Sequence, residues 1–302
     1  MNDTAASITA LPAARERRWL VPLALLAVYV IWGSTYLGIR IGLTGFPPFA
    51  MAALRFFAAG IAMYAWLRLR GMPAPTPRQW RNAAVTGVLL LGFGNGLVCF
   101  AEQGVSSGMA AVAIASEPLF VALFLFFYRE RPSRGEVIGL IVGFLGVLLL
   151  NSAGAMRAAP WAAAALLIAT ASWAFGSIWS RRQDMPKGPM NVAAQMLCAA
   201  PALALMAWAT GERLPVHPPV QSILALAYLA VFGSIIAFSA YLFLVKTARP
   251  ALTASYAYVN PPIAVLLGAL LAGEHVGAPE LAGMAVILAG VAIITLAHAR
   301  PR

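Results

Sequence analysis

Long apolar runs separated by short polar or Pro/Gly-rich breaks follow one another along most of the chain. A helix needs about 20 apolar residues to cross the hydrocarbon core of a membrane. The predicted spans are the ten runs at residues 20–39, 47–67, 82–103, 108–128, 134–152, 160–180, 190–209, 221–245, 251–272 and 278–298. Because these runs lack the two-residue alternation of a transmembrane barrel, the pattern predicts an all-α integral membrane protein with ten transmembrane helices.

Two offsets indicate that the chain contains two copies of one unit of five spans. At an offset of 144 the identical pairs are Ala110 and Ala254, Ala113 and Ala257, Pro118 and Pro262, Leu123 and Leu267, Glu130 and Glu274, Glu136 and Glu280, Gly139 and Gly283, Gly146 and Gly290, and Val147 and Val291. At an offset of 141, Trp32 aligns with Trp173 and Pro48 with Pro189. We therefore predict a first repeat at residues 20–152 and a second at 160–298, after an N-terminal segment at 1–19.

The charged loops predict that the two repeats have opposite orientations. The first copy has Arg129, Arg131 and Arg134 where the second has Gly273, His275 and Ala278. Lys and Arg in short loops mark the cytoplasmic side of a membrane, so the two units should be inverted relative to each other. With ten spans, 17 of the 21 Lys and Arg residues fall on one face, which places both termini, including the 1–19 segment, in the cytoplasm.

Composition agrees with a membrane protein and limits the alternatives. The chain has 302 residues, of which 61% are hydrophobic and 10% charged, and a mean hydropathy of +0.81. The net charge of +11 follows from the topology and needs no nucleic acid partner. Cys99 and Cys198 lie inside spans, and the three His are far apart, so neither a disulfide framework nor a metal site is predicted.

Several polar and aromatic side chains lie inside the predicted spans. Trp32 and Tyr36 share one helical face by their spacing of four, and their counterparts in the sixth span are Trp173 and Ser177. The other candidates for a substrate cavity are Asn95, Glu117, Tyr256, Tyr258 and Asn260. Packing, or anchoring at the membrane interface, is the alternative role of the two tryptophans.

Prolines at mid-span predict helix kinks near these side chains. Pro118 follows Glu117 and lacks an amide proton, and Pro261 and Pro262 follow Asn260 at the repeated position. Broken helices at the centre of the membrane are where many transporters bind their substrates. Glu117 is also the candidate for carrying a proton, the alternative being a carboxylate held permanently by Arg55 or a tyrosine.

Arg55 is a further candidate because it lies well inside the second span. A cation at that depth is costly unless it finds a partner or water, which predicts a buried ion pair with Glu102. The alternative is that the side chain extends to the membrane interface. Glycines spaced by four, such as Gly139 and Gly143, predict close pairing of the fifth and tenth helices, and a homodimer face is the alternative use of the same residues.

The sequence resembles the EamA branch of the drug/metabolite transporter (DMT) superfamily over residues 20–298. The resemblance is carried by Trp32-Gly33-Ser34-Thr35-Tyr36, Gly-Met-Ala-Ala at 108–111, Pro118, and Arg129-Glu130-Arg131-Pro132. It implies a central cavity lined by the first, third, fourth, sixth, eighth and ninth helices. It also implies export of amino acids, other small metabolites or drugs from the bacterial cytoplasm, in exchange for protons. Glu117 departs from the small or hydroxyl residue expected there.

We therefore predict a secondary active exporter of small amphipathic metabolites, in the cell inner membrane, that works by alternating access. Its partners would be a small-molecule substrate, the lipid bilayer and protons, with no cofactor. Without a nucleotide-binding P-loop, energy must come from an ion gradient or from the substrate's own gradient. The alternatives are a passive facilitator or importer on the same scaffold, and an intramembrane enzyme acting on lipid-linked substrates. The enzyme is disfavoured because the ten Asp and Glu residues are scattered along the chain.

Overall fold

The computed structural model describes residues 20–127, 133–152, 159–248, 256–275 and 277–299, and every regular element in these ranges is helical. The first helix, Leu20–Gly42, contains the π-helical segment η1 (Val28–Trp32) and α2 (Gly33–Gly42). The others are α3 (Pro48–Leu69), α4 (Pro77–Gly87), η2 (Val88–Asn95), α5 (Gly96–Ala101), α6 (Ser107–Ile114), α7 (Glu117–Phe127), α8 (Arg134–Ser152), α10 (Pro160–Ser180), α11 (Pro189–Ala209), α12 (Val220–Tyr228), η3 (Leu229–Ile236), α13 (Ala237–Thr247), α15 (Tyr256–Ala272) and α16 (Ala278–Ala299).

Seven helices in the described ranges are long and apolar enough to cross a membrane, and shorter apolar helices occupy the positions of the predicted fifth, ninth and tenth spans. Large apolar side chains such as Leu148, Leu205 and Leu270 are exposed on the outside of the bundle, as a lipid-facing surface requires. The third helix begins at Pro77, five residues before the predicted start. There the hydroxyl of Thr76 accepts a hydrogen bond from the amide of Gln79 (3.2 Å), and this cap starts the helix in a polar turn.

The fourth span is broken at the point that Pro118 predicts. α6 ends at Ile114, and α7 begins at Glu117 after a two-residue turn, in which the Ser116 hydroxyl donates to the carbonyl of Ala113 (2.6 Å). The ninth span behaves differently: α15 continues through Pro261 and Pro262, so the kinks predicted there do not end the helix. A proline removes one amide donor without requiring the helix to end. In the fourth span there is a second cause, because the hydrogen bond from the Ser116 hydroxyl to a backbone carbonyl competes with the backbone hydrogen bonds of the helix.

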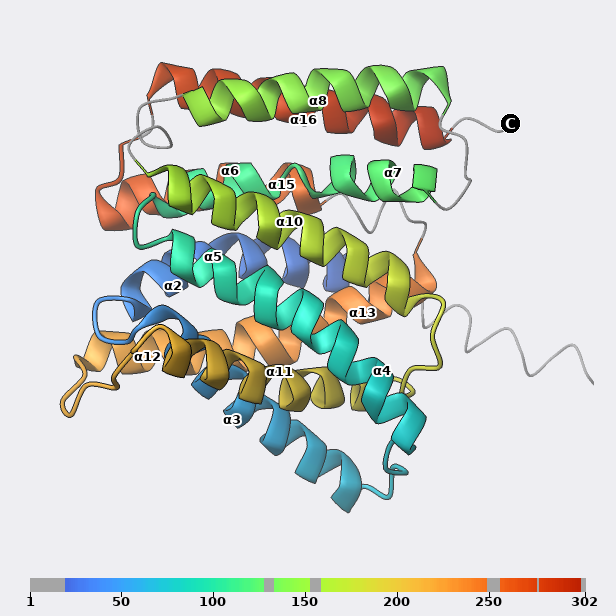
Figure 1. The fold of residues 1–302 in the computed structure, drawn as a ribbon, viewed down its shortest axis with the longest axis vertical. Coiled ribbons are helices and arrows are strands. Elements are labelled where there is room, and N and C mark those ends of the chain that lie inside the picture. The colour runs from blue at the N-terminus through green and yellow to red at the C-terminus, as the bar shows by residue number, and fades with distance from the viewer. Residues whose placement is uncertain (1–19, 128–132, 153–158, 249–255, 276, 300–302) are drawn as a thin grey trace, which may run out of the picture.

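Equivalent helices of the two repeats pack against each other in opposite directions. The Cβ of an alanine at Gly135, near the start of α8, would lie 2.9 Å from the Cβ of Ala297, near the end of α16. Further along, a Cβ at Gly146 would lie 2.6 Å from the backbone nitrogen of Ile287. Figure 1 shows this α8–α16 pair along one edge of the bundle, next to α6, α7 and α15. The glycines therefore allow the pairing of the fifth and tenth helices within one chain.

The repeat extends to unusual backbone geometry. η2 starts at Val88 and η3 at Leu229, 141 positions later, and each is eight residues long. This is the offset that aligns Pro48 with Pro189, the first residues of α3 and α11. π-helical segments are rare and often occur at functional sites. Because η2 and η3 occur at matching positions of the two repeats, the region between them is a candidate functional site.

One end of the bundle is tied together by carboxylates that cap helices. Glu274, in the loop after α15, accepts hydrogen bonds from the amide of Ser107 (2.9 Å) and its hydroxyl (2.7 Å) at the start of α6. Glu212, in the loop after α11, accepts from the amide of Ala50 (2.8 Å) in the first turn of α3. A negative charge stabilises a helix N-terminus, so these bonds join loops to helices at this end of the bundle. We call it the Glu274 end.

The opposite end is joined through Asp184, in the loop between α10 and α11. The side chain of Gln79 donates to the carboxylate of Asp184 (3.1 Å), and that of Asn82 donates to its backbone carbonyl (3.0 Å). Loops predicted on one face of the membrane thus meet at the Glu274 end, and loops predicted on the other face meet at this Asp184 end. The arginine-rich loop with Arg129 and Arg131 lies outside the described residues.

Adding a methyl group at Gly290 should destabilise the protein. Its Cβ would overlap the backbone of Gly143, which cannot move without separating α8 from α16. We expect Gly290→Ala to lower the stability by about 1–3 kcal/mol. Gly92→Ala is the matched control, because its Cβ would find its nearest atom at 3.7 Å in ordinary van der Waals contact. Thermal unfolding of the two purified variants in detergent checks this, and equal melting temperatures would contradict the proposed close packing.

Candidate substrate cavity

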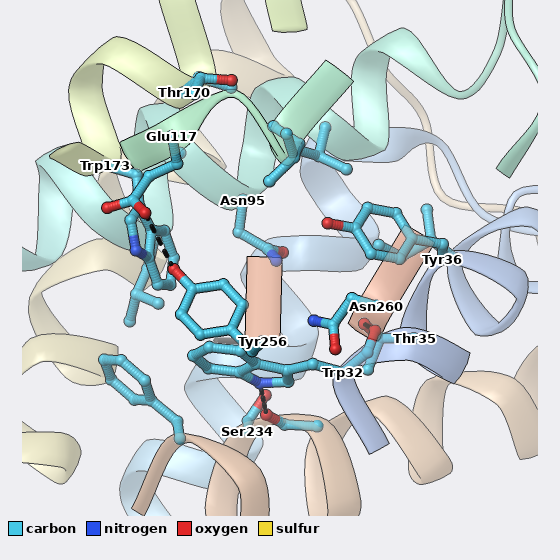
Figure 2. Close-up of a pocket in the computed structure, with 18 of the residues that line it drawn as sticks. Trp32, Thr35, Tyr36, Asn95, Glu117, Thr170, Trp173, Ser234, Tyr256 and Asn260 are labelled. Atoms are coloured by element: carbon cyan, nitrogen blue, oxygen red, sulfur yellow. Dashed lines mark hydrogen bonds between the residues drawn. The ribbon is translucent and has the colours of Figure 1, made fainter. Parts of the chain in front are cut away.

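A cavity lies inside the bundle, between helices of both repeats. Its volume is about 80 Å³, which holds a few water molecules and is smaller than the 300 Å³ or so at which ligand pockets begin. The lining residues are Trp32, Thr35, Tyr36, Ile39, Arg55, Phe56, Leu91, Gly94, Asn95, Val98, Ile114, Glu117, Ala169, Thr170, Trp173, Gly233, Ser234, Phe238, Tyr256 and Asn260. Figure 2 shows that polar groups approach this space from several sides.

Most of the side chains proposed from the sequence line this central cavity. They are Trp32, Tyr36, Asn95, Glu117, Trp173, Tyr256 and Asn260. Ser177 lies one turn beyond Trp173 on α10 and does not line the cavity. The side chain of Tyr258 lies outside the described part of the structure.

Aromatic rings form one wall of the cavity. The ring of Trp32 lies 5.8 Å from that of Trp173, 5.0 Å from Tyr241 and 5.3 Å from Tyr256, measured between centroids. The indole nitrogen of Trp32 donates to the backbone carbonyl of Gly233 (3.3 Å). Both tryptophans therefore pack inside the protein, and the interfacial anchoring considered for them is not what the structure shows.

Glu117 lies at the break between α6 and α7, where its side chain is only 6% exposed. The hydroxyl of Tyr256 on α15 donates to its carboxylate at 3.4 Å, as the dashed line in Figure 2 shows. Arg55 or a tyrosine was considered as the partner of Glu117 from the sequence, and the structure has a tyrosine there. At 3.4 Å this is a long hydrogen bond for a carboxylate.

Arg55 does not form the predicted ion pair with Glu102. Its side chain is 4% exposed and donates to the hydroxyl of Ser234 (2.7 Å) and to the amide oxygen of Asn95 (3.3 Å). Both oxygens of the buried Glu102 carboxyl lack a hydrogen-bond partner among the described residues, and Arg40 donates only to its backbone carbonyl (2.7 Å). The two side chains lie in different places: Glu102 is at the end of the third span, near the Glu274 end. The partner of Arg55 is instead Ser234, which belongs to the other repeat.

Asn260 adds an unused acceptor to the cavity. Its side chain is 4% exposed, and its amide oxygen has no hydrogen-bond partner in the described chain. A buried polar atom without a partner is costly, and a ligand in the cavity can satisfy it.

Among the described residues there is no group of His, Cys, Asp or Glu that could hold a metal ion.

Sequence reasoning missed part of the cavity. Ser234, Phe238 and Thr170 were not identified, because a hydroxyl or aromatic residue is ordinary in a membrane helix. The sequence did contain a signal for Ser234. The offset of 141 aligns its neighbour Gly233 with Gly92, which lies in the glycine-rich third span. Of the glycines there, Gly94 packs on Trp173, where a Cβ would lie 2.9 Å from the indole ring.

Comparison with known proteins agrees with this architecture. The chain is 46% identical to the "Uncharacterized inner membrane transporter YedA" of Escherichia coli strain K12 over 282 residues, which is 92% of each chain. It is 25% identical to a "Probable amino-acid metabolite efflux pump" of Salmonella typhimurium over 292 residues, covering 90% of this chain and 93% of that one.

"Protein PecM" of Dickeya dadantii is 25% identical over 268 residues, covering 87% and 88% of the two chains. A solved structure described as "Crystal structure of protein" shares the fold, with a TM-score of 0.66 at 22% identity, and the alignment covers 94% of this chain and 99% of that one. The EamA-like transporter family matches residues 19–152 and 160–296, separately in each predicted repeat. The chain therefore belongs to the EamA-like transporter family of the DMT superfamily, as its motifs indicated.

Proposed function

We propose that this protein exports small amphipathic metabolites, amino acids among them, across the bacterial inner membrane by alternating access. The observation that carries this proposal is a polar and aromatic cavity between helices of the two repeats. Relatives described as an inner membrane transporter and an amino-acid metabolite efflux pump support it. On this proposal ten helices cross the bilayer, with α6 and α7 together as the fourth span.

The size of the cavity supports alternating access. A volume of about 80 Å³ is small for a ligand pocket, so we expect the substrate to bind a conformation that is more open than this one. Hydrogen bonds between loops and helix N-termini, as at Glu212 and Ala50, join the helices at the Glu274 end. Substrate release toward that end requires these contacts to separate. Rigid movement of one helix bundle against the other is how inverted repeats achieve this.

The proposed topology places the Glu274 end in the periplasm and the Asp184 end in the cytoplasm, with both termini cytoplasmic. We expect a cysteine at the exposed His275 to react with an impermeant maleimide added to intact cells, and a cysteine at the exposed Arg78 to react only in inverted vesicles. The background is the Cys99→Ala/Cys198→Ala variant, which removes both natural thiols. Labelling of both positions from the same side would overturn the inverted arrangement.

The export function is tested by overexpression in a bacterial host and measurement of intracellular metabolites. Cells that produce the protein should contain less of its substrates than cells that produce Trp173→Leu. We expect that variant to transport roughly 2- to 10-fold more slowly, since one aromatic contact contributes about 0.5–1.5 kcal/mol. Trp208→Leu is the matched control, because Trp208 is 78% exposed and lies outside the cavity. Unchanged metabolite levels in every strain would contradict export.

Glu117 is the proposed proton carrier. Burial disfavours a charged carboxylate, so binding of a proton and binding of a cationic group can alternate at this site. In proteoliposomes we expect Glu117→Gln to abolish transport driven by a pH gradient while substrate exchange without a gradient continues. Gradient-driven transport that survives in this variant would exclude Glu117. Wild-type transport indifferent to the gradient would instead indicate a passive facilitator.

A further inference from the structure

Arg55 introduces a positive charge into the interior that no described carboxylate contacts. It is the eighth residue of α3, lines the cavity and is 4% exposed. Its hydrogen-bonded partners, Ser234 and Asn95, are both neutral. A guanidinium group carries five N–H donors, and the bonds of Arg55 to described residues use one at Nε and one at Nη1. The cavity is therefore lined by a cation whose other N–H donors have no hydrogen bond to a described residue.

The π-helical segments of both repeats form the surroundings of this cation. Asn95 is the last residue of η2, and Ser234 belongs to η3, its counterpart in the second repeat. Gly233 makes room for the guanidinium, because a Cβ there would lie 2.8 Å from Nη2 of Arg55. The phenyl ring of Phe56 adds a cation–π contact, with its centroid 4.9 Å from Cζ. Two distant parts of the chain thus fix the position of one charge.

A row of contacts connects Arg55 with the acidic side of the cavity. Ser234 follows Gly233, whose carbonyl accepts from Trp32 (3.3 Å), and the ring of Trp32 packs on Tyr256, which donates to Glu117 (3.4 Å). In Figure 2, Trp32 and Tyr256 lie between Ser234 and Glu117. The cavity therefore has a basic side and an acidic side separated by aromatic rings.

We propose that Arg55, with Asn95 and Ser234, is an anion-binding subsite that takes the carboxylate group of the transported molecule. This inference rests on the proposed transport function and narrows its substrate class to small carboxylates, foremost zwitterions such as amino acids. A planar guanidinium matches a carboxylate in two-point hydrogen bonding. The ammonium group of a zwitterion then lies toward Glu117 and the unused amide oxygen of Asn260.

A carboxylate fits this subsite better than a phosphate group does. Arg55 offers one positive charge, and Glu117 in the same cavity is acidic. A phosphate monoester carries up to two negative charges at neutral pH, which one arginine would leave partly unneutralised in a buried site. A carboxylate carries a single charge and balances Arg55 on its own. Inorganic phosphate is therefore a probe that should not bind.

Ligand binding to the purified wild-type protein tests the proposal directly. The probes are the twenty common L-amino acids, their carboxamides, 3-phenylpropionate and inorganic phosphate, with thermal stabilisation in detergent as the measurement. We expect at least one amino acid to stabilise the protein and its carboxamide to bind roughly 10- to 100-fold more weakly, since the amide cannot form the charge-assisted pair. Equal binding of an acid and its amide, stabilisation by phosphate alone, or no binding of any amino acid would overturn the proposal.

Variants assign the effect to Arg55. Arg55→Gln should weaken binding of the acid roughly 10- to 100-fold and leave binding of the amide unchanged, so that the preference for the acid disappears. Arg55→Lys keeps the charge and loses the planar fork, and should show an intermediate preference. Arg78→Gln, which removes the same charge from an exposed residue, should keep the wild-type preference. A preference that persists in Arg55→Gln would overturn the subsite.

Two features keep this test separate from the proposed transport function. If Arg55→Gln fails to fold, Ser234→Ala keeps the arginine and removes the acceptor of its Nε–H, and should still lower the preference for the acid over its amide. If wild-type protein binds or exports metabolites that have no carboxylate equally well, the transport function stands and the anion subsite is wrong. If no metabolite is exported at all, the proposed function itself has failed.

Discussion

Close antiparallel packing of equivalent helices is the constraint on which the rest of the structure depends. Within a membrane there is no hydrophobic force between helices, so association relies on contact of backbone with backbone. α8 and α16 reach that contact at Gly146, Gly290 and their neighbours, where any side chain would meet the opposing main chain. α3 and α11 repeat this arrangement, with Gly60 against Met196. Both pairs join one repeat to the other, so neither half can be placed without its partner.

The cavity arises where this packing gives way to irregular backbone. η2 and η3 interrupt the α-helical hydrogen-bond pattern at equivalent positions, and the fourth span is broken next to Glu117. Irregular backbone at membrane depth is tolerated where it is buried in protein or lines a cavity. These segments supply Asn95 and Ser234 to the cavity. The same geometry that costs regular hydrogen bonds thus positions the polar groups that a substrate would contact.

Charge is distributed differently inside the bundle and at its ends. Glu212 and Glu274 cap helices from loops, where water access makes a carboxylate inexpensive and a helix N-terminus favours it. Arg55 and Glu117 are buried in the cavity without direct contact to an opposite charge among the described residues. End charges therefore stabilise one arrangement of the loops, whereas the interior charges are the groups that we propose for ligand binding.

The sequence by itself determined the all-helical architecture, the presence of two repeats and the positions of the seven long apolar helices in the described ranges, because apolar length and internal identity are local properties of the chain. It also located most of the cavity residues, since a polar group such as Asn95 or Glu117 is conspicuous in an apolar run. It placed the partner of Arg55 wrongly, because the partners of a buried side chain arrive from distant segments. Only the tertiary structure brings Ser234 to Arg55 and Tyr256 to Glu117, since the antiparallel packing of two repeats decides which faces meet.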